Sequence, residues 1–127
     1  EEAQELIKRF SAGQKLLYVF WYLDGQVTNG GFIQFYWNAY RSYLPAIIEG
    51  LELIKDAQML ALIKKADAYY LINEGMFGEQ KSKDDSESLY NKLKTFDDYD
   101  EEYYKQLEVT LVVVTSTAIT TKSKYEQ

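Results

Sequence analysis

The stretch VTNGGFIQFYWN, residues 27–38, places two glycines between carboxamides and follows them with four aromatic residues in six positions. A helix before it is expected to end near Thr28, because a glycine just beyond can adopt the left-handed conformation without a Cβ clash. Asn29 can then cap the next helix by accepting a backbone N–H. We therefore interpret the stretch as a tight helix–Gly-Gly–helix joint.

Side chains after the glycines divide into two faces. Three aromatic residues recur at helical spacing and should face a core: Phe32, Phe35 and Tyr36. Gln34 and Asn38 fall four residues apart on another side, where they are expected to bond to the neighbouring backbone. The alternative is a small polar pocket lined by Asn29, Gln34 and Asn38, which could bind a small ligand but could not supply acid–base chemistry. The glycine pair lacks the spacing of a phosphate-binding loop.

Helical periodicity extends on both sides of the joint, which predicts an all-α, single-domain bundle of about five to seven helices over residues 1–127. Gly13 is expected to separate a short first helix from a second. The apolar face of the second consists of Leu16, Phe20, Leu23 and Val27. Beyond the joint, Ser42 is expected to cap a third helix that has Pro45 in its first turn. Asp56 can cap a fourth helix, which runs to about Ile72.

The segment of residues 73–88 carries no periodicity and is predicted to form a loop. A helix is expected to resume at Leu89 and to break at Asp97 or Asp98. Asp100 can then cap another helix through its side chain.

The tail, residues 109–127, gives conflicting signals. Ten of the thirteen residues 109–121 are β-branched, which favours a strand. A lone strand has no obvious partner elsewhere in the chain, and apolar residues in this segment keep helical spacing. We predict a helix to about Thr117 within a tail that is otherwise irregular or helical.

The composition limits the chemistry that is open to the chain. It contains no His and no Cys, so imidazole catalysis, thiolate nucleophiles, zinc fingers and disulfides are excluded. The acidic run DDYDEE lacks the glycine and the ligand spacing of an EF-hand. We predict no enzyme activity, no cofactor and no metal site. No segment is apolar enough to span a membrane, and the lack of Cys and of a visible signal peptide fits the cytoplasm.

The net charge of −6 disfavours direct binding to nucleic acid or to anionic membranes. The whole imbalance lies in residues 74–102, because the charges of the remaining residues cancel. Carboxylates there can form either a solvated, helix-capping surface or a face for a basic protein partner. The candidate partner-binding residues are Asp84, Asp85, Glu87, Asp97, Asp98, Asp100, Glu101 and Glu102.

The string YLDGQVTNGGFIQFYWN, residues 22–38, resembles the hallmark of the bacterial DNA-mimic-protein family, a domain of unknown function with an NGGF-x-QF core. The matching residues are Asn29, Gly30, Gly31, Phe32, Gln34, Phe35 and Asn38. A looser likeness extends to about residue 72, and FDDYDEEYY, residues 96–104, is similar to a late acidic stretch of that family. The tail departs from the family, whose members usually end in a charged helix.

This resemblance implies an all-helical fold and a role in transcription regulation. Surface carboxylates would mimic duplex DNA and occupy the nucleic-acid-binding surface of a basic protein, such as a helix-turn-helix regulator. The chain could also form a homodimer. Two alternatives remain: an immunity-type inhibitor of a nuclease toxin, and a small-ligand-binding domain that uses the Asn29, Gln34 and Asn38 face. The signature residues themselves are expected to be structural.

Overall fold

A computed structural model describes the backbone of residues 2–78 and 83–121 and the side chains of residues 5–78 and 85–121. Within these ranges the chain is helical and contains no strand, which confirms the all-α prediction. The elements are α1 (Glu2–Ile7), α2 (Ala12–Trp37), the 3-10 helix η1 (Tyr40–Tyr43), α3 (Leu44–Leu53), α4 (Ala57–Ile72), α5 (Gly75–Gly78), α6 (Lys83–Lys92) and α7 (Thr95–Thr120).

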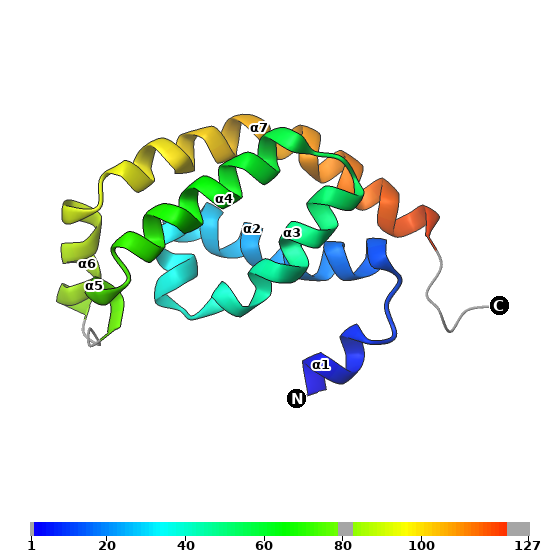
Figure 1. Cartoon of the computed structure of the whole chain (residues 1–127), viewed down its shortest axis with the longest axis horizontal. Coiled ribbons are helices and arrows are strands. Elements are labelled where there is room, and N and C mark those ends of the chain that lie inside the picture. The colour runs from blue at the N-terminus through cyan, green and yellow to red at the C-terminus, as the bar shows by residue number, and fades with distance from the viewer. Residues whose placement is uncertain (1, 79–82, 122–127) are drawn as a thin grey trace.

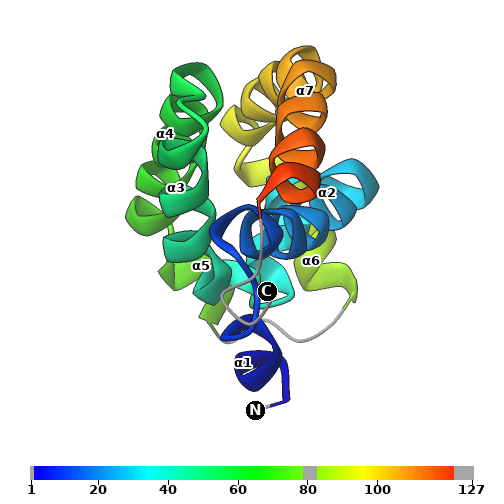
Figure 2. The same cartoon turned by 90° about the vertical axis from the view of Figure 1, so that its right-hand side faces the viewer.

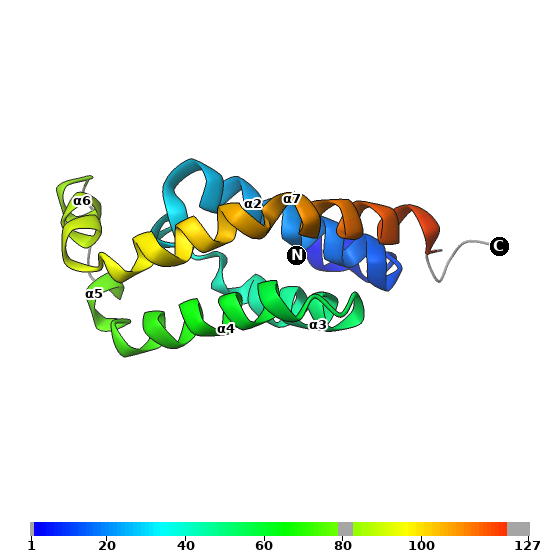
Figure 3. The same ribbon diagram turned by 90° about the horizontal axis from the view of Figure 1, so that it is seen from above.

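The helices form two layers (Figure 1). The long helices α2 and α7 run antiparallel in one layer, and α3 and α4 form the other, as Figure 2 and Figure 3 show from two further sides. The antiparallel pairing is fixed at both ends. Ser11 Oγ lies 3.0 Å from Thr121 Oγ1 at one end, and the Phe32 amide donates to Asp100 at the other. The short helices α5 and α6 lie where α4 ends and α7 begins.

The core lies between the two layers and is rich in aromatic rings. The predicted apolar face of α2 is confirmed, since Leu16, Phe20, Leu23 and Val27 are all buried. Phe32, Phe35, Phe96 and Tyr103 join them with 1% exposure or less. Full burial of each such side chain contributes about 1.5–3 kcal/mol of transfer free energy, so these contacts dominate the stability of the bundle.

Gly13 does not separate two helices as predicted, because α2 already begins at Ala12. Ser11 caps α2 in a capping box: the Gln14 amide donates to Ser11 Oγ at 3.1 Å, and the Ser11 amide donates to Gln14 Oε1 at 3.1 Å. Gly13 lies in the first turn of α2, where a Cβ would stand 2.7 Å from the Thr117 carbonyl oxygen of α7. The glycine therefore allows the two long helices to approach closely.

The caps of α3 and α4 differ in how well sequence predicted them. Ser42 does not cap α3, because η1 runs directly into α3 and leaves Tyr43 at the cap position without a side-chain bond. Pro45 does lie in the first turn, as predicted. The Asp56 cap is confirmed: the Met59 amide donates to Asp56 Oδ1 at 3.0 Å. The other oxygen of Asp56 accepts from Thr110 Oγ1 at 2.6 Å, which ties α4 to α7.

The segment predicted as a loop contains helical structure. Helix α5 lies within it, and α6 begins at Lys83 rather than at Leu89. The first turns of α6 are polar, and its buried residues begin only at Leu89, so there was no apolar period to detect. The break before α7 also comes earlier than Asp97. Asp97 and Asp98 lie instead in the first turn of α7, where carboxylates stabilise the helix dipole.

The β-branched tail is helical as predicted, and α7 continues past Thr117 to Thr120. Tertiary packing overrides strand propensity here, because Thr110, Val114 and Ala118 are buried. The hydroxyl of Thr117 donates back to the Val113 carbonyl at 2.8 Å, a bond that threonine can make inside a helix. The part of the tail at residues 122–127 lies outside the described residues.

Candidate functional site

The glycine pair breaks α2 as predicted. Gly30 (φ −147°, ψ 18°) and Gly31 (φ 76°, ψ −179°) leave helical geometry, and the conformation of Gly31 belongs to a region that only glycine occupies readily. A Cβ on Gly31 would also collide with the Asp100 carboxylate. Both the backbone angle and the neighbour therefore require glycine at this position.

Side chains from α6 and α7 bind the backbone groups that the break exposes. The Phe32 amide donates to Asp100 Oδ1 at 2.9 Å, the Tyr104 hydroxyl donates to the Val27 carbonyl at 3.2 Å, and the Tyr90 hydroxyl donates to the Gly30 carbonyl at 2.6 Å. Asn29 was predicted to cap the second part of the helix, and that prediction is wrong. Asp100 performs this function instead, from 68 residues further along the chain.

Asp100 does not cap a new helix, because α7 is already continuous from Thr95. Its carboxylate is half-buried against the joint. Burial raises the pKa of Asp100 from 3.8 to about 6; the hydrogen bond from the Phe32 amide acts in the opposite direction, and the nearby charge of Asp97 raises the pKa further. Asp100 is thus a structural carboxylate at the joint.

The signature carboxamides bond to one another rather than to backbone, which corrects the sequence-based expectation. We call Gln26, Asn29, Gln34 and Asn38 the carboxamide cluster. Gln26 Oε1 accepts from Gln34 Nε2 at 3.1 Å and from Asn38 Nδ2 at 2.8 Å, and Asn29 Nδ2 donates to Gln34 Oε1 at 3.1 Å. Sequence reasoning missed Gln26, which lies 8 residues before Gln34 and 12 before Asn38 on the far side of the break, so its place beside them depends on the geometry of the joint.

A small cavity of about 160 Å³ lies beside this cluster. Its lining consists of Ile33, Gln34, Trp37, Asn38, Ser86 and Tyr90, so it is formed between the end of α2 and α6. Gln34 and Asn38 were among the three residues of the predicted polar pocket. Asn29 does not line the cavity.

The eight candidate carboxylates occupy different environments. Four are exposed: Glu87 on α6, and Asp97, Asp98 and Glu101 on α7. Asp85 is half-buried, Asp100 faces the joint, and the side chain of Asp84 lies outside the described residues. Glu102 is half-buried and binds Lys65 Nζ and Gln106 Nε2, each at 3.2 Å. Glu108, exposed on the same helix, was not among the predicted residues.

Helix α7 therefore presents two kinds of surface along its length. Its first half carries the exposed carboxylates of Asp97, Asp98 and Glu101, and Glu108 follows at its middle. The second half exposes apolar side chains, with Val109 70% and Ile119 78% accessible. The buried side of both halves packs on the core, which fixes the carboxylates on a rigid element.

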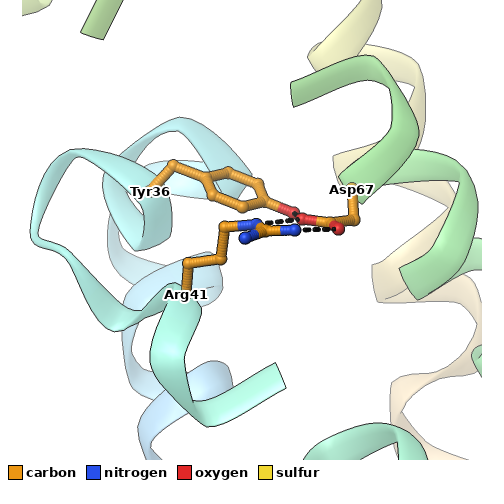
Figure 4. Close-up of polar contacts among 3 residues, drawn as sticks. All are labelled: Tyr36, Arg41 and Asp67. Atoms are coloured by element: carbon orange, nitrogen blue, oxygen red, sulfur yellow. Dashed lines mark hydrogen bonds and ion pairs between the residues drawn. The ribbon is translucent and has the colours of Figure 1, made fainter. Parts of the chain in front are cut away.

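A second polar group, which the sequence did not indicate, joins the end of α2 and η1 to α4 (Figure 4). Asp67 accepts from the Tyr36 hydroxyl at 2.9 Å and from Arg41 through two nitrogens, at 2.9 and 2.8 Å. The ring of Tyr36 also stacks on Tyr70 at a centroid distance of 4.0 Å. Burial, followed by the neighbouring Asp67 charge, raises the pKa of Tyr36. These groups satisfy one another, so we assign them a structural role.

Two further properties concern the described residues as a whole. None of their His, Cys, Asp or Glu side chains gather in groups of three that could hold a metal ion. None of the helices in residues 2–78 and 83–121 is both long enough and apolar enough to cross a membrane.

The fold and this surface define a class of protein: a small all-α bundle that displays carboxylates on the solvent side of a long helix. Within this class, the chain belongs to the family of DMP19-like proteins, whose model matches residues 8–115. This is the DNA mimic protein family, so the resemblance noted in the sequence is confirmed. A search of curated proteins and a search of solved structures each gave no match.

Proposed function

We propose that the protein binds the nucleic-acid-binding surface of a basic protein, such as a helix-turn-helix transcription regulator, and so keeps that partner from its DNA. Membership of the DNA mimic family is the observation that carries the proposal. The exposed carboxylates of α7 supply a physical means. The identity of the partner and the location of the interaction in the bacterial cytoplasm are both part of the proposal. The proposal does not depend on whether the protein is a monomer or a homodimer.

The spacing of charge on α7 supports mimicry of one DNA strand. A helix rises about 1.5 Å per residue, so residues 97–108 span roughly 17 Å. One strand of duplex DNA presents a phosphate every ~3.4 Å, or about five over that length. Over this span α7 presents four exposed carboxylates, those of Asp97, Asp98, Glu101 and Glu108, while the half-buried Glu102 is paired with Lys65. Lys105 lies among these carboxylates and offsets one negative charge. The number of carboxylates is therefore comparable with the phosphates of one DNA strand and too small for those of both strands.

The proposed face therefore differs from the set expected from sequence. Asp97, Asp98 and Glu101 form its centre, because they are exposed and no basic group among the described residues pairs with them. Glu108 extends it along α7, and Glu87, which belongs to α6, is not counted in this face. Asp100 is left out because its carboxylate binds the Phe32 amide.

The test is capture of basic proteins from a bacterial lysate at low and at high salt. Exposed charges are screened by salt, so the captured regulator should dissociate as ionic strength rises. The double variant Asp98→Asn/Glu101→Gln should weaken capture about tenfold or more. The matched control is Glu52→Gln/Glu74→Gln, which changes the net charge equally at exposed positions outside α7.

A gel-shift assay then distinguishes the outcomes. The captured regulator should lose its DNA when the wild-type protein is added. Capture of a basic nuclease that the protein inhibits would favour the immunity-type alternative. Equal weakening by both double variants would show that only net charge acts, and would remove the assignment to α7.

A further inference from the structure

We propose that the cavity beside the carboxamide cluster receives the guanidinium group of an arginine side chain from the protein partner. This inference rests on the proposed function and deepens it. The carboxylates of α7 stand for phosphates, and the carboxamide cluster stands for the edge of a base.

The size of the cavity selects the end of a side chain rather than a small-molecule ligand. Pockets that bind cofactors and drug-sized molecules measure about 300–1,000 Å³. The cavity between α2 and α6 measures about 160 Å³. A nucleotide or cofactor would not fit, whereas one planar group carried by a partner would.

The hydrogen bonds within the cluster leave an acceptor at the cavity. Asn38 Nδ2 and Gln34 Nε2 each donate one N–H to Gln26 Oε1, which fixes the orientation of both lining carboxamides. Gln34 Oε1 accepts from Asn29, and Asn38 Oδ1 has no partner among the described residues. These bonds join side chains only and satisfy no backbone group. A carboxamide oxygen of this kind accepts from a cationic donor.

Two aromatic side chains in the cavity wall favour arginine over lysine. Trp37 and Tyr90 both line it, and the Tyr90 hydroxyl is anchored to the Gly30 carbonyl at 2.6 Å. A planar guanidinium stacks on aromatic faces and donates through several N–H groups at once. An ammonium group is more strongly hydrated and has no plane to stack.

The charge of the chain and the chemistry of DNA recognition identify the source of the arginine. A net charge of −6 favours a basic protein and disfavours nucleic acid itself. Arginine that contacts the two acceptor atoms of guanine is the commonest specific contact in the major groove. An arginine from such a surface would meet a carboxamide oxygen here in place of the base.

The experiment compares an oligoarginine peptide with an oligolysine peptide of equal length, titrated into the full chain. We expect the wild-type protein to bind the arginine peptide about five- to tenfold more tightly. The variant Asn38→Ala should bind both peptides with the affinity that the wild type shows for the lysine peptide. The variant Asp98→Asn/Glu101→Gln should weaken both peptides equally and keep the preference.

A second measurement uses only the wild-type protein, so it does not depend on whether a variant folds. In ¹⁵N NMR spectra of the wild type, the side-chain amides of Gln34 and Asn38 and the indole of Trp37 should shift with the arginine peptide but not with the lysine peptide. Equal affinity for the two peptides, or a preference that survives Asn38→Ala, would overturn the inference. If the two peptides bind the wild type equally well but the α7 variant weakens both, the inference about the cavity fails and the proposed function still stands.

Discussion

The Asp100 carboxylate accepts a hydrogen bond from the Phe32 amide at 2.9 Å, across 68 residues of sequence. This contact explains why the chain needs a glycine at position 31 and an acceptor on α7. The amide is freed by the break in α2, and the carboxylate enters the space that a Cβ at Gly31 would fill. The signature stretch and the acidic stretch are therefore two parts of one structural unit.

Substitution of Asp100 should separate its hydrogen bond from its charge. Asp100→Asn keeps an oxygen acceptor for the Phe32 amide and removes a half-buried charge, so stability at neutral pH should be unchanged or higher. Asp100→Ala leaves that amide unpaired and should lower the free energy of unfolding by about 1–3 kcal/mol. Urea denaturation of the two variants measures the difference. Equal destabilisation would show that the charge itself is needed.

The pKa of Asp100 makes a further prediction about pH. Its folded-state pKa of about 6 lies above the ordinary 3.8, so the folded state binds the proton more tightly than the unfolded state. The contribution of this carboxyl to stability is full below pH 3.8 and is lost as the pH rises through about 6. Relative to Asp100→Asn, wild-type stability should fall between these values and level off above about pH 7. A relative stability that rises over this window would contradict the assignment.

Gly31 and Gly25 provide a matched pair of alanine substitutions within α2. Gly31→Ala should destabilise by about 2 kcal/mol or more, because its backbone angle and the Asp100 carboxylate both oppose a Cβ. Gly25 is exposed, and a Cβ there meets nothing within 4 Å. Gly25→Ala should therefore stabilise by about 0.5–1 kcal/mol. Thermal unfolding of both variants checks the opposite signs.

The Tyr36 hydroxyl should contribute measurably to the joint between α2 and α4. Tyr36→Phe keeps the stacked ring and removes the bond to Asp67, which should cost about 1–2 kcal/mol. Tyr69→Phe is the control, since the Tyr69 hydroxyl has no hydrogen-bond partner among the described residues, and it should change stability by less than about 0.5 kcal/mol. Equal changes in stability for the two variants would show that the hydrogen bond to Asp67 does not contribute.

Local features of this chain could be predicted from sequence, and long-range ones could not. The apolar face of α2, the break at the glycine pair and the Asp56 cap each depend on neighbours within a few residues. The Phe32 amide finds its acceptor, and Gln26 its two donors, only where the folded chain brings separate segments together. No spacing rule connects Asp100 to Gly31 or Tyr36 to Asp67.

Some element boundaries failed although their signals are local. The capping box at Ser11 was not recognised in the sequence, and the direct passage of η1 into α3 moved the cap position of α3 from Ser42 to Tyr43. The polar first turns of α6 carried no apolar period at all. Among the candidate carboxylates, sequence identified the acidic stretch but not which of its members point to solvent, because Asp100 and Glu102 are occupied by contacts from other helices.

The antiparallel pairing of α2 with α7 bears on how the chain folds during synthesis. The apolar face of α2 is covered by α7, which is synthesised well after it, and the three side chains that bind the broken backbone come from residues 90–104. Until that region emerges, α2 has an uncovered apolar face and a bend that nothing holds. Contacts this far apart in sequence raise the contact order, so we expect α2 to become ordered only after α7 has been synthesised, and folding to be slow for a helical protein of this size.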